Sequence, residues 1–411
     1  MTPVRRTGVD QAGSHVVLGL DAGTTSAKAV VVDRAGEILA TGGSDPIAVS
    51  STPDGGREQD PEEIWQALAT AGRRAVRGLG PGVGVAALAV AAQSGSVIPV
   101  TVEGRAERAI TWMDTRFWSV PENWSDGVAA RVRAVSGWMP TPGVGLSTIV
   151  GLQAPGTRQP GADPAPVSRW ASVDDYLVFR LTGQWATNPS NAAGMQLMDV
   201  TTRTWSDELC SLAGIDGGQL SPIRESGSTA GELAGEAAAA LALDAAIPVV
   251  IGGHDQACAA LGLGVVDPGH LFLSAGTAWV LTAVTDRTDV ASLPPSLNLS
   301  PHVLGGVWTA SENLGGLGAM LAETPPARIQ EAFEKCGLKV RLALEEAGEF
   351  AAGGDELVMV GGGLRFSELV DVLANIIDRP VVTRPEAAWP ALGAARLAAA
   401  ALGWTPHEGA P

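Results

Sequence analysis

Residues 16–33 read VVLGLDAGTTSAKAVVVD, and residues 271–284 read LFLSAGTAWVLTAV. In each stretch a β-type run ends in Ala-Gly-Thr and leads directly into a second β-type run. The Gly-Thr pair at 23–24 therefore recurs at 276–277. A repeated strand–loop–strand unit predicts a duplicated fold that presents two similar loops to one ligand.

The chemistry of these loops favours phosphate. A glycine lets backbone N–H groups approach closely, and a threonine adds a hydroxyl donor. Convergent N–H groups hold anions, so two such loops facing each other suit a nucleoside triphosphate. A single loop of this type could equally be a tight hairpin, but its repetition favours phosphate binding. Asp21 would then hold Mg²⁺, largely through water, because Mg²⁺ prefers few carboxylates and retained waters.

Composition narrows the class of protein. A chain of 411 residues predicts two or three domains, and 45% hydrophobic residues suffice for sizeable cores. The net charge of −17 argues against a nucleic acid or an anionic membrane as partner. No apolar run reaches membrane-spanning length, and residues 1–14 are expected to be a flexible tail without a signal core. The three cysteines are isolated, which favours a reducing cytoplasm over a disulfide framework or a zinc site.

The pattern of apolar residues restarts after residue 265. We therefore predict an N-terminal domain over 15–265 and a C-terminal domain over 266–411. A helix should open at Asp60, which suits an N-cap ahead of Pro61, and the Pro- and Gly-rich stretch 139–168 should be loop. Strands are expected at 15–21, 28–33, 37–41, 85–91, 97–102, 247–252, 270–274, 278–284, 307–311 and 356–360. Helices are expected at 172–181, 255–263, 315–322, 327–349 and 366–378.

Residues 252–256 read GGHDQ and join the strand expected at 247–252 to the helix expected at 255–263. Asp255 could be an ordinary helix N-cap. It could also be a general base that accepts a hydroxyl proton during group transfer. The motif alone leaves both interpretations open.

Residues 112–116 read WMDTR. An aromatic ring, a carboxylate and a guanidinium at alternating positions could stack on and hydrogen-bond a polyol. The simpler interpretation is a surface ion pair beside a core tryptophan. Similarly, Gly361–Gly363 could be a plain loop or bare backbone that lets a flat adenine lie close.

Several other chemistries are excluded. The five histidines show no metal-ligand spacing, and Cys258 is best explained as a small core residue. Neither a Walker-type GxxxxGK[ST] motif nor a GxSxG motif is present. No GxGxxG follows the first strand, which argues against a dehydrogenase.

Taken together and in this order, the motifs resemble those of the FGGY carbohydrate kinases, the family of xylulokinase, gluconokinase and glycerol kinase. The resemblance runs from Val17 to about Gly403 and is strongest in LGLDAGTTSAKAVVVD, GREQDPEEIW, AITWMDTR, GGHDQACAALGLG and MVGGGLRFSELVDVLANIIDRPV. It implies an α/β fold of two ribonuclease-H-like domains, as in actin and hexokinase, around a central nucleotide cleft.

The resemblance also implies roles for individual residues. Asp255 is expected to be the catalytic base, and Asp21 and Asp255 are the expected carboxylates of a Mg²⁺ site. The residues expected at the nucleotide are Asp21, Gly23, Thr24, Thr25, Gly276, Thr277, Gly316, Gly361, Gly362 and Ser367. The residues expected at the acceptor are Gln93, Trp112, Asp114, Asp255 and Gln256.

The chain departs from the family pattern beside Gln93. Xylulokinases usually continue with Met-His-Gly and glycerol kinases with Arg-Glu, whereas Ser94 and Gly95 follow here. Thin polar lining predicts a roomier acceptor site and leaves xylulose and glycerol unassigned. The block at 112–116 is nearer to the WADTR of gluconokinases.

A second departure is the short connection over 321–328, where family members usually carry a longer block. The predicted C-terminal domain is thus shortened there. We expect nucleotide binding to survive while domain closure is impaired, which predicts a weak sugar-dependent rate and a comparatively high sugar-independent ATPase. The strand at 307–311 should be an exposed sheet edge or be covered by the helix after Pro326. An exposed edge would favour a homodimer.

These observations predict an ATP-dependent carbohydrate kinase that phosphorylates a hydroxyl of a ketopentose, a sugar acid or a polyol. The alternative is a nucleotide-binding protein of actin-like fold with little or no sugar kinase activity, which acts as a sensor or interaction module. The block at 112–116 and Asp255 favour the kinase, because a nucleotide switch needs neither.

Overall fold

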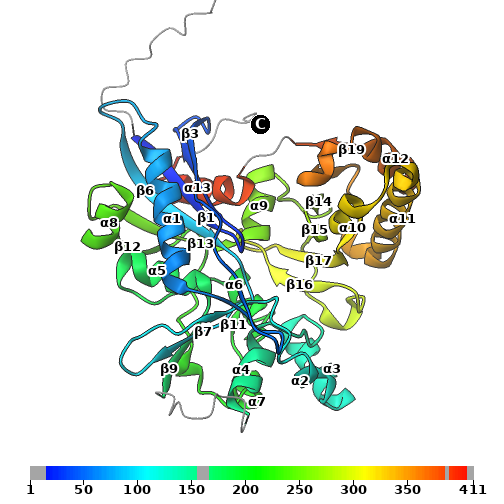
Figure 1. Cartoon of the computed structure of the whole chain (residues 1–411), viewed down its shortest axis with the longest axis horizontal. Helices are drawn as coiled ribbons and strands as arrows, with labels where there is room; N and C mark the ends of the chain where they lie inside the picture. The colour runs from blue at the N-terminus through cyan, green and yellow to red at the C-terminus, as the bar shows by residue number, and fades with distance from the viewer. Residues whose placement is uncertain (1–14, 155–165, 385–387, 405–411) are drawn as a thin grey trace, which may run out of the picture.

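A computed structural model describes residues 15–154, 166–384 and 388–404. It contains two six-stranded mixed sheets, and Figure 1 shows them side by side, the first built from the blue to green part of the chain and the second from the yellow to orange part. The tail predicted at 1–14 lies outside the described residues.

The first sheet has the order β12–β13–β6–β1–β2–β3. β1 pairs antiparallel with β2 and parallel with β6, which in turn pairs parallel with β13. β1 is an apolar run that is buried on both faces, as expected for a strand covered by helices on either side. The strands are β1 (His15–Ala22), β2 (Ala27–Val32), β3 (Ile38–Gly43), β6 (Gly84–Ala92), β12 (Thr229–Glu232) and β13 (Pro248–His254).

Helix α1 (Pro61–Val76) covers one face of this sheet, with Ile64 and Leu68 fully buried. The predicted N-cap is confirmed, because a carboxylate oxygen of Asp60 accepts a hydrogen bond of 2.9 Å from the backbone N–H of Glu62.

Helix α13 (Trp389–Ala401) comes from the other end of the chain and packs on the opposite face of the first sheet (Figure 1). A Cβ on Gly19 of β1 would lie 1.9 Å from the Ala391 carbonyl oxygen, so the helix backbone rests directly on the strand. The domain boundary between residues 265 and 266 remains a prediction. Helix α13 lies within the predicted C-terminal domain along the sequence, but it packs on the first sheet.

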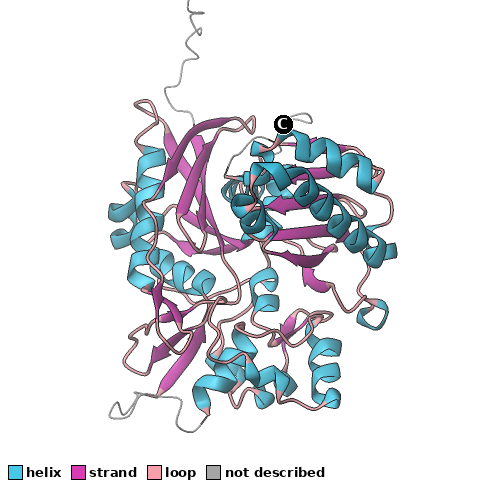
Figure 2. Cartoon of the chain, turned by 45° about the vertical axis from the view of Figure 1, so that its right-hand side comes forward, coloured by secondary structure: helices cyan, strands magenta, loops and turns pink. Residues whose placement is uncertain are grey.

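The second sheet has the order β16–β17–β15–β14–β18–β19. β14 pairs antiparallel with β15 and parallel with β18, which repeats the pairing of β1 with β2 and β6. Helices lie across one face of this sheet (Figure 2), where Phe333 and Leu369 join its core. The strands are β14 (Leu271–Ala275), β15 (Trp279–Thr285), β16 (Asn298–Pro301), β17 (Trp308–Gly315), β18 (Leu357–Val360) and β19 (Val381–Thr383).

The prediction that the strand at 307–311 is an exposed sheet edge is wrong. The alternative, cover by the helix after Pro326, agrees with the core cluster that Ala310 of β17 shares with Phe333 of α11 (Ile329–Ala347). β17 contains the strand expected at 307–311, but it lies between β15 and β16 and is an inner strand. β16 forms the edge instead, and it was missed because four residues ending in a proline carry little strand signal. The argument for a homodimer through the strand at 307–311 therefore loses its basis.

The prediction that 139–168 is loop is wrong in part, because α4 spans Gly145–Gln153. Its glycines permit close packing, since a Cβ on Gly151 would lie 2.1 Å from the Phe117 ring. Residues 155–165 of this stretch lie outside the described residues.

The other helices are α2 (Ser119–Glu122), α3 (Asp126–Ser136), α5 (Val173–Thr182), α6 (Pro189–Gly194), α7 (Asp207–Leu212), α8 (Gly235–Leu241), α9 (Asp255–Leu263), α10 (Leu317–Glu323), α11 (Ile329–Ala347) and α12 (Ser367–Ile377).

Short strands complete the first half: β4 (Ser50–Ser51), β5 (Arg57–Gln59) and β8 (Ala109–Ile110) form one small sheet, β7 (Ile98–Thr101) pairs with β9 (Val167–Ala171), and β10 (Met198–Asp199) pairs with β11 (Thr204–Trp205). All three cysteines are free and buried, in agreement with the absence of a disulfide framework. In the described part of the chain, no helix is both long enough and apolar enough to span a membrane.

Candidate active site

The parallel strands of the first sheet bring the predicted site residues together. β1 ends at the Asp21 loop, β6 ends just before Gln93, and β13 ends just before Asp255. Because β1, β6 and β13 are parallel neighbours, these three ends meet at one edge of the sheet.

A cavity of about 310 Å³ lies at this edge, between the two halves of the chain. That volume is at the lower end of the range for small-molecule sites. The first half contributes Thr24, Gln93, Trp112, Asp255 and Gln256 to its lining. The second half contributes Thr282, Asn298, Ser300, Thr309, Ser311 and Asn313.

Asp255 is the first residue of α9, and the N-cap position belongs to His254. The N-cap interpretation of Asp255 is therefore wrong. Its carboxylate lies 3.0 Å from Nε2 of His254, whose backbone N–H donates to Oγ of Ser190 over 2.9 Å. The carboxylate is thus held in place at the cavity wall, where it is accessible to a ligand hydroxyl.

Asp21 is 6% exposed, and within the described residues its Oδ1 atom has no hydrogen-bond partner. Burial is the main cause that raises the pKa of this carboxyl to about 8, the negative charge of Asp255 acts in the same direction, and Lys28 opposes the shift. Two neighbouring carboxylates, one of them with an unsatisfied oxygen, suit a divalent cation that completes its shell with water and phosphate oxygens.

A hydrogen-bond network links the first loop to the cavity wall. Oγ1 of Thr24 donates to Oε1 of Gln93 over 3.0 Å and accepts from Nε1 of Trp112 over 3.1 Å. Nε2 of Gln93 donates to Oε1 of Gln59 over 3.1 Å. Thr24 and Gln93 therefore line the cavity with their polar atoms already engaged, and they orient Trp112, which is 40% exposed.

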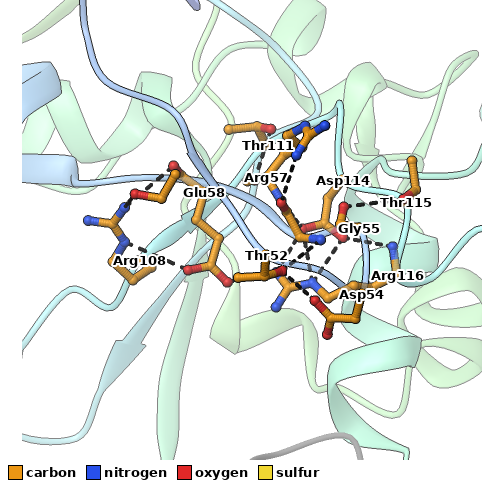
Figure 3. Close-up of polar contacts among 12 residues, drawn as sticks. Thr52, Asp54, Gly55, Arg57, Glu58, Arg108, Thr111, Asp114, Thr115 and Arg116 are labelled. Atoms are coloured by element: carbon orange, nitrogen blue, oxygen red, sulfur yellow. Dashed lines mark hydrogen bonds and ion pairs between the residues drawn. The ribbon is translucent and has the colours of Figure 1, made fainter.

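Asp114 does not belong to the lining of the cavity, and Figure 3 shows it among Gly55, Thr115 and Arg116. It is fully buried, and its carboxylate accepts from the backbone N–H of Arg57 and from Nε and Nη2 of Arg116. Arg116 also pairs with Glu58 over 2.8 Å. The prediction that Asp114 contacts the acceptor is therefore corrected: this residue positions the chain that carries Trp112.

We expect Asp114→Ala to lower the free energy of unfolding by about 2–4 kcal/mol, because it leaves a partly buried guanidinium with one partner fewer. Urea unfolding measures this loss. Glu208→Ala is the matched control, since it removes an exposed pair with Arg131 and should leave the free energy of unfolding almost unchanged. Equal losses in the two variants would contradict the positioning role.

The second Ala-Gly-Thr loop is enclosed by two glycine-rich segments. A Cβ on Gly318, at the start of α10, would lie 1.9 Å from the Gly276 carbonyl oxygen. Gly361, just after β18, has φ +97°, and its Cβ would lie 2.9 Å from the Ala275 carbonyl oxygen. The parallel pairing of β14 with β18 brings Gly361 to this loop, and the antiparallel pairing of β15 with β17 brings Gly318 to it.

The residues expected at the nucleotide around this loop are Gly276, Thr277, Gly316, Gly361, Gly362 and Ser367. Within the described residues, none of them belongs to the lining of the cavity. Thr277 is exposed, and the Ser367 hydroxyl donates to the Glu368 carboxylate over 3.0 Å. On the first loop, Gly23 is partly buried and Thr25 exposed. Nucleotide contacts by these residues remain a prediction.

Gly318→Ala is expected to displace the second loop, because a methyl group there collides with backbone and overpacking costs about 1–3 kcal/mol. Mg-ATP should bind at least about 5-fold more weakly by calorimetry. Gly235→Ala is the control, since a Cβ at that helical glycine meets nothing within 4 Å. Unchanged nucleotide affinity in a folded Gly318→Ala protein would contradict the enclosure of this loop.

The wall from the second half was not predicted. Its side chains come from three antiparallel strands, and their register depends on turns that sequence periodicity does not reveal. Trp138 was also missed, although its indole N–H donates to Ser300 Oγ across the two halves over 3.0 Å.

The comparisons with known proteins place this geometry in a family. Residues 16–262 match the N-terminal domain and residues 306–402 the C-terminal domain of the FGGY family of carbohydrate kinases. The fold is the ribonuclease-H-like fold of the actin and hexokinase type. The chain belongs to the FGGY family of carbohydrate kinases.

Among its relatives, an autoinducer-2 kinase of Salmonella typhimurium is 30% identical over 304 residues, which is 71% of this chain and 55% of that protein. The chain thus spans about half the length of the curated relatives it matches. A gluconate kinase structure from Lactobacillus acidophilus has a TM-score of 0.82 at 21% identity and covers 95% of this chain and 90% of its own. A Plasmodium falciparum glycerol kinase structure with ADP has a TM-score of 0.80 at 17% identity, over 95% and 90%.

Proposed function

We propose that this protein is an ATP-dependent carbohydrate kinase that transfers the γ-phosphoryl group to a hydroxyl of a sugar, sugar acid or polyol. The observation that carries the proposal is the position of Asp255, an accessible carboxylate in a cavity formed by both halves and close to the buried Asp21. The glycerol kinase structure of similar fold is a complex with ADP, which supports a nucleotide as one ligand of this protein.

In this mechanism the acceptor hydroxyl oxygen forms a bond to the γ-phosphorus, the bond to the β–γ bridging oxygen breaks, and ADP leaves. Asp255 accepts the hydroxyl proton. His254 and Ser190 hold Asp255 in place, and Trp112 offers an aromatic surface to the acceptor. Most of the rate should come from this positioning, as in phosphoryl transfer generally.

Asp21 and Asp255 are the residues that would hold Mg²⁺. The ion supplies positive charge to the phosphate oxygens when it is bound. The unpartnered Oδ1 of Asp21, beside the carboxylate of Asp255, fits a cation at this position. The two Ala-Gly-Thr loops would hold the phosphates through their backbone N–H groups.

The rival function is a nucleotide-binding protein of the same fold that phosphorylates no sugar. A coupled assay of ADP release over a panel of ketoses, sugar acids and polyols separates the two. We expect at least one acceptor to raise ADP release above the rate without acceptor. A rate that no acceptor raises would favour the rival.

A further inference from the structure

One face of the second sheet changes from apolar to polar where it meets the cavity. Val284 on β15 packs in an apolar cluster with Phe272 and Val358. Thr282 lies two residues earlier on the same face and lines the cavity instead. The change coincides with the cavity wall, which points to a ligand rather than to a packed core.

The polar side chains form a row across three strands. Ser311 of β17 pairs directly with Thr282 of β15 on one side and with Asn298 of β16 on the other. Direct partners on antiparallel strands project from the same face of a sheet. All three residues line the cavity. We call the two hydroxyl side chains, Thr282 and Ser311, together with the neighbouring carboxamide of Asn298, the hydroxyl row.

Buried polar atoms in this cavity lack partners. Thr282 is 2% exposed, and within the described residues its hydroxyl makes no hydrogen bond. Oε1 of Gln256, in the wall from the first half, is also buried and unpartnered among them. An unsatisfied buried polar group costs about 1–3 kcal/mol, so both atoms favour a ligand that hydrogen-bonds to them.

The edge strand β16 is anchored to the first half of the chain. The Leu299 N–H donates to the Gly137 carbonyl over 3.0 Å, and Trp138 donates to Ser300 on the same strand. Nη2 of Arg133 donates to the Pro294 carbonyl over 2.8 Å. These bonds fix the hydroxyl row at the wall opposite Gln256 and Trp112.

The charge of the lining limits the ligand. Among the described residues, those that line the cavity include no lysine or arginine, and Asp255 contributes an acidic group. A carboxylate on the ligand would find no cationic partner there. Hydroxyl groups, in contrast, can both donate to and accept from the threonine, serine and asparagine side chains.

We propose that Thr282, Asn298 and Ser311 hydrogen-bond to the acceptor on the side of the acceptor that faces away from Asp255. These three residues thereby select a neutral, polyhydroxylated carbon chain that is longer than a triol. This proposal rests on the proposed function. It narrows the range of acceptors, because sugar acids are excluded. A triol such as glycerol carries three hydroxyl groups, so it cannot offer one to Asp255 and one to each of the three side chains of the row.

The test is calorimetric titration with glycerol, xylitol, D-xylulose and gluconate, with and without MgADP. Wild type should bind xylitol or D-xylulose more tightly than glycerol and gluconate. Thr282→Val and Ser311→Ala should each weaken that binding about 3- to 10-fold, as expected for one lost hydrogen bond, and should leave ADP binding unchanged. Thr285→Val is the control, because this buried threonine on the same strand lies outside the lining.

The proposal would be overturned if none of the four probes bound, or if glycerol or gluconate bound more tightly than xylitol and D-xylulose. Equal probe affinity in wild type and both variants would overturn it as well. Loss of ADP affinity in the variants would also overturn it, since the row would then face the nucleotide. Failure of phosphorylation is a separate result, because these readouts measure binding alone. If the variants showed that the hydroxyl row does not bind acceptors while the wild-type protein still phosphorylated one, the proposed function would remain intact.

Discussion

Asp255→Asn is expected to lower the acceptor-dependent kcat by about 10²- to 10⁴-fold, the usual contribution of a positioned general base. The amide keeps the size of the side chain and a hydrogen-bonding group beside His254, but it accepts no proton at neutral pH. ATP affinity should change much less than kcat, because the proton transfer belongs to the reaction rather than to nucleotide binding. Steady-state kinetics and a nucleotide titration measure the two effects.

Asp207→Asn is the matched control for this variant. Asp207 is also the first residue of a helix, α7, and it lies outside the cavity lining. The Asp207→Asn variant should retain wild-type turnover. If Asp255→Asn also retained turnover, another group would have to accept the proton and the assignment would fail.

Asp21→Ala should weaken Mg-ATP binding by about 10-fold or more, the scale expected when a group that supports a metal is removed. Binding of ATP without Mg²⁺ should change far less. Titrations with and without the ion separate these effects. Asp174→Asn is the control, because Asp174 is likewise buried with its pKa raised to about 8, mainly by desolvation, yet lies outside the cavity lining. Equal Mg²⁺ dependence in wild type and Asp21→Ala would contradict the metal site.

The raised pKa of Asp21 also predicts how stability depends on pH. The folded protein holds this proton up to about pH 8, whereas the unfolded chain releases it near its ordinary value of 3.8. The contribution of Asp21 to stability is therefore greatest in acid and falls as the pH rises from about 4 to about 8. Asp21→Asn removes this dependence, so its melting temperature should exceed that of ligand-free wild type by a margin that grows over this range. A constant margin in thermal unfolding would contradict the shift.

Much of the first half could be predicted from local signals. Helix α9 begins and ends at the residues expected from the sequence, because a glycine-rich turn precedes Asp255 and Gly264 follows Leu263. The two Ala-Gly-Thr loops follow from apolar runs interrupted by a turn motif. The residues that make up each of these signals lie close together in the sequence, so the signals can be recognised without knowledge of the tertiary structure.

Features that depend on distant parts of the chain could not be predicted in this way. α13 packs on β1 although most of the chain separates them, and only the glycine at position 19 reveals how close they come. Asp114 has the residue type of a ligand contact, but the backbone N–H of Arg57, in the distant strand β5, donates a hydrogen bond to it. The hydroxyl row depends on the pairing of three strands, so Thr282, Asn298 and Ser311 show no common pattern along the chain.

The predicted shortening of the connection near 321–328 makes the fate of the phosphoryl group the central question. Family membership and the cavity support transfer to a sugar, whereas impaired closure would favour transfer to water. In the described structure, β16 ties the second sheet to the first half through Gly137 and Trp138, so part of the cavity is assembled without the missing block.

The most direct measurement is phosphorus NMR of the products formed from Mg-ATP and the best acceptor, with wild type and Asp255→Asn compared at equal concentration. A sugar kinase predicts a phosphate monoester of the acceptor that forms in the wild type and is almost absent in the variant. Inorganic phosphate from acceptor-independent hydrolysis should accompany the ester, because impaired closure lets part of the ATP react with water. Inorganic phosphate as the sole product, formed equally by both proteins and unaffected by acceptor, would contradict the account.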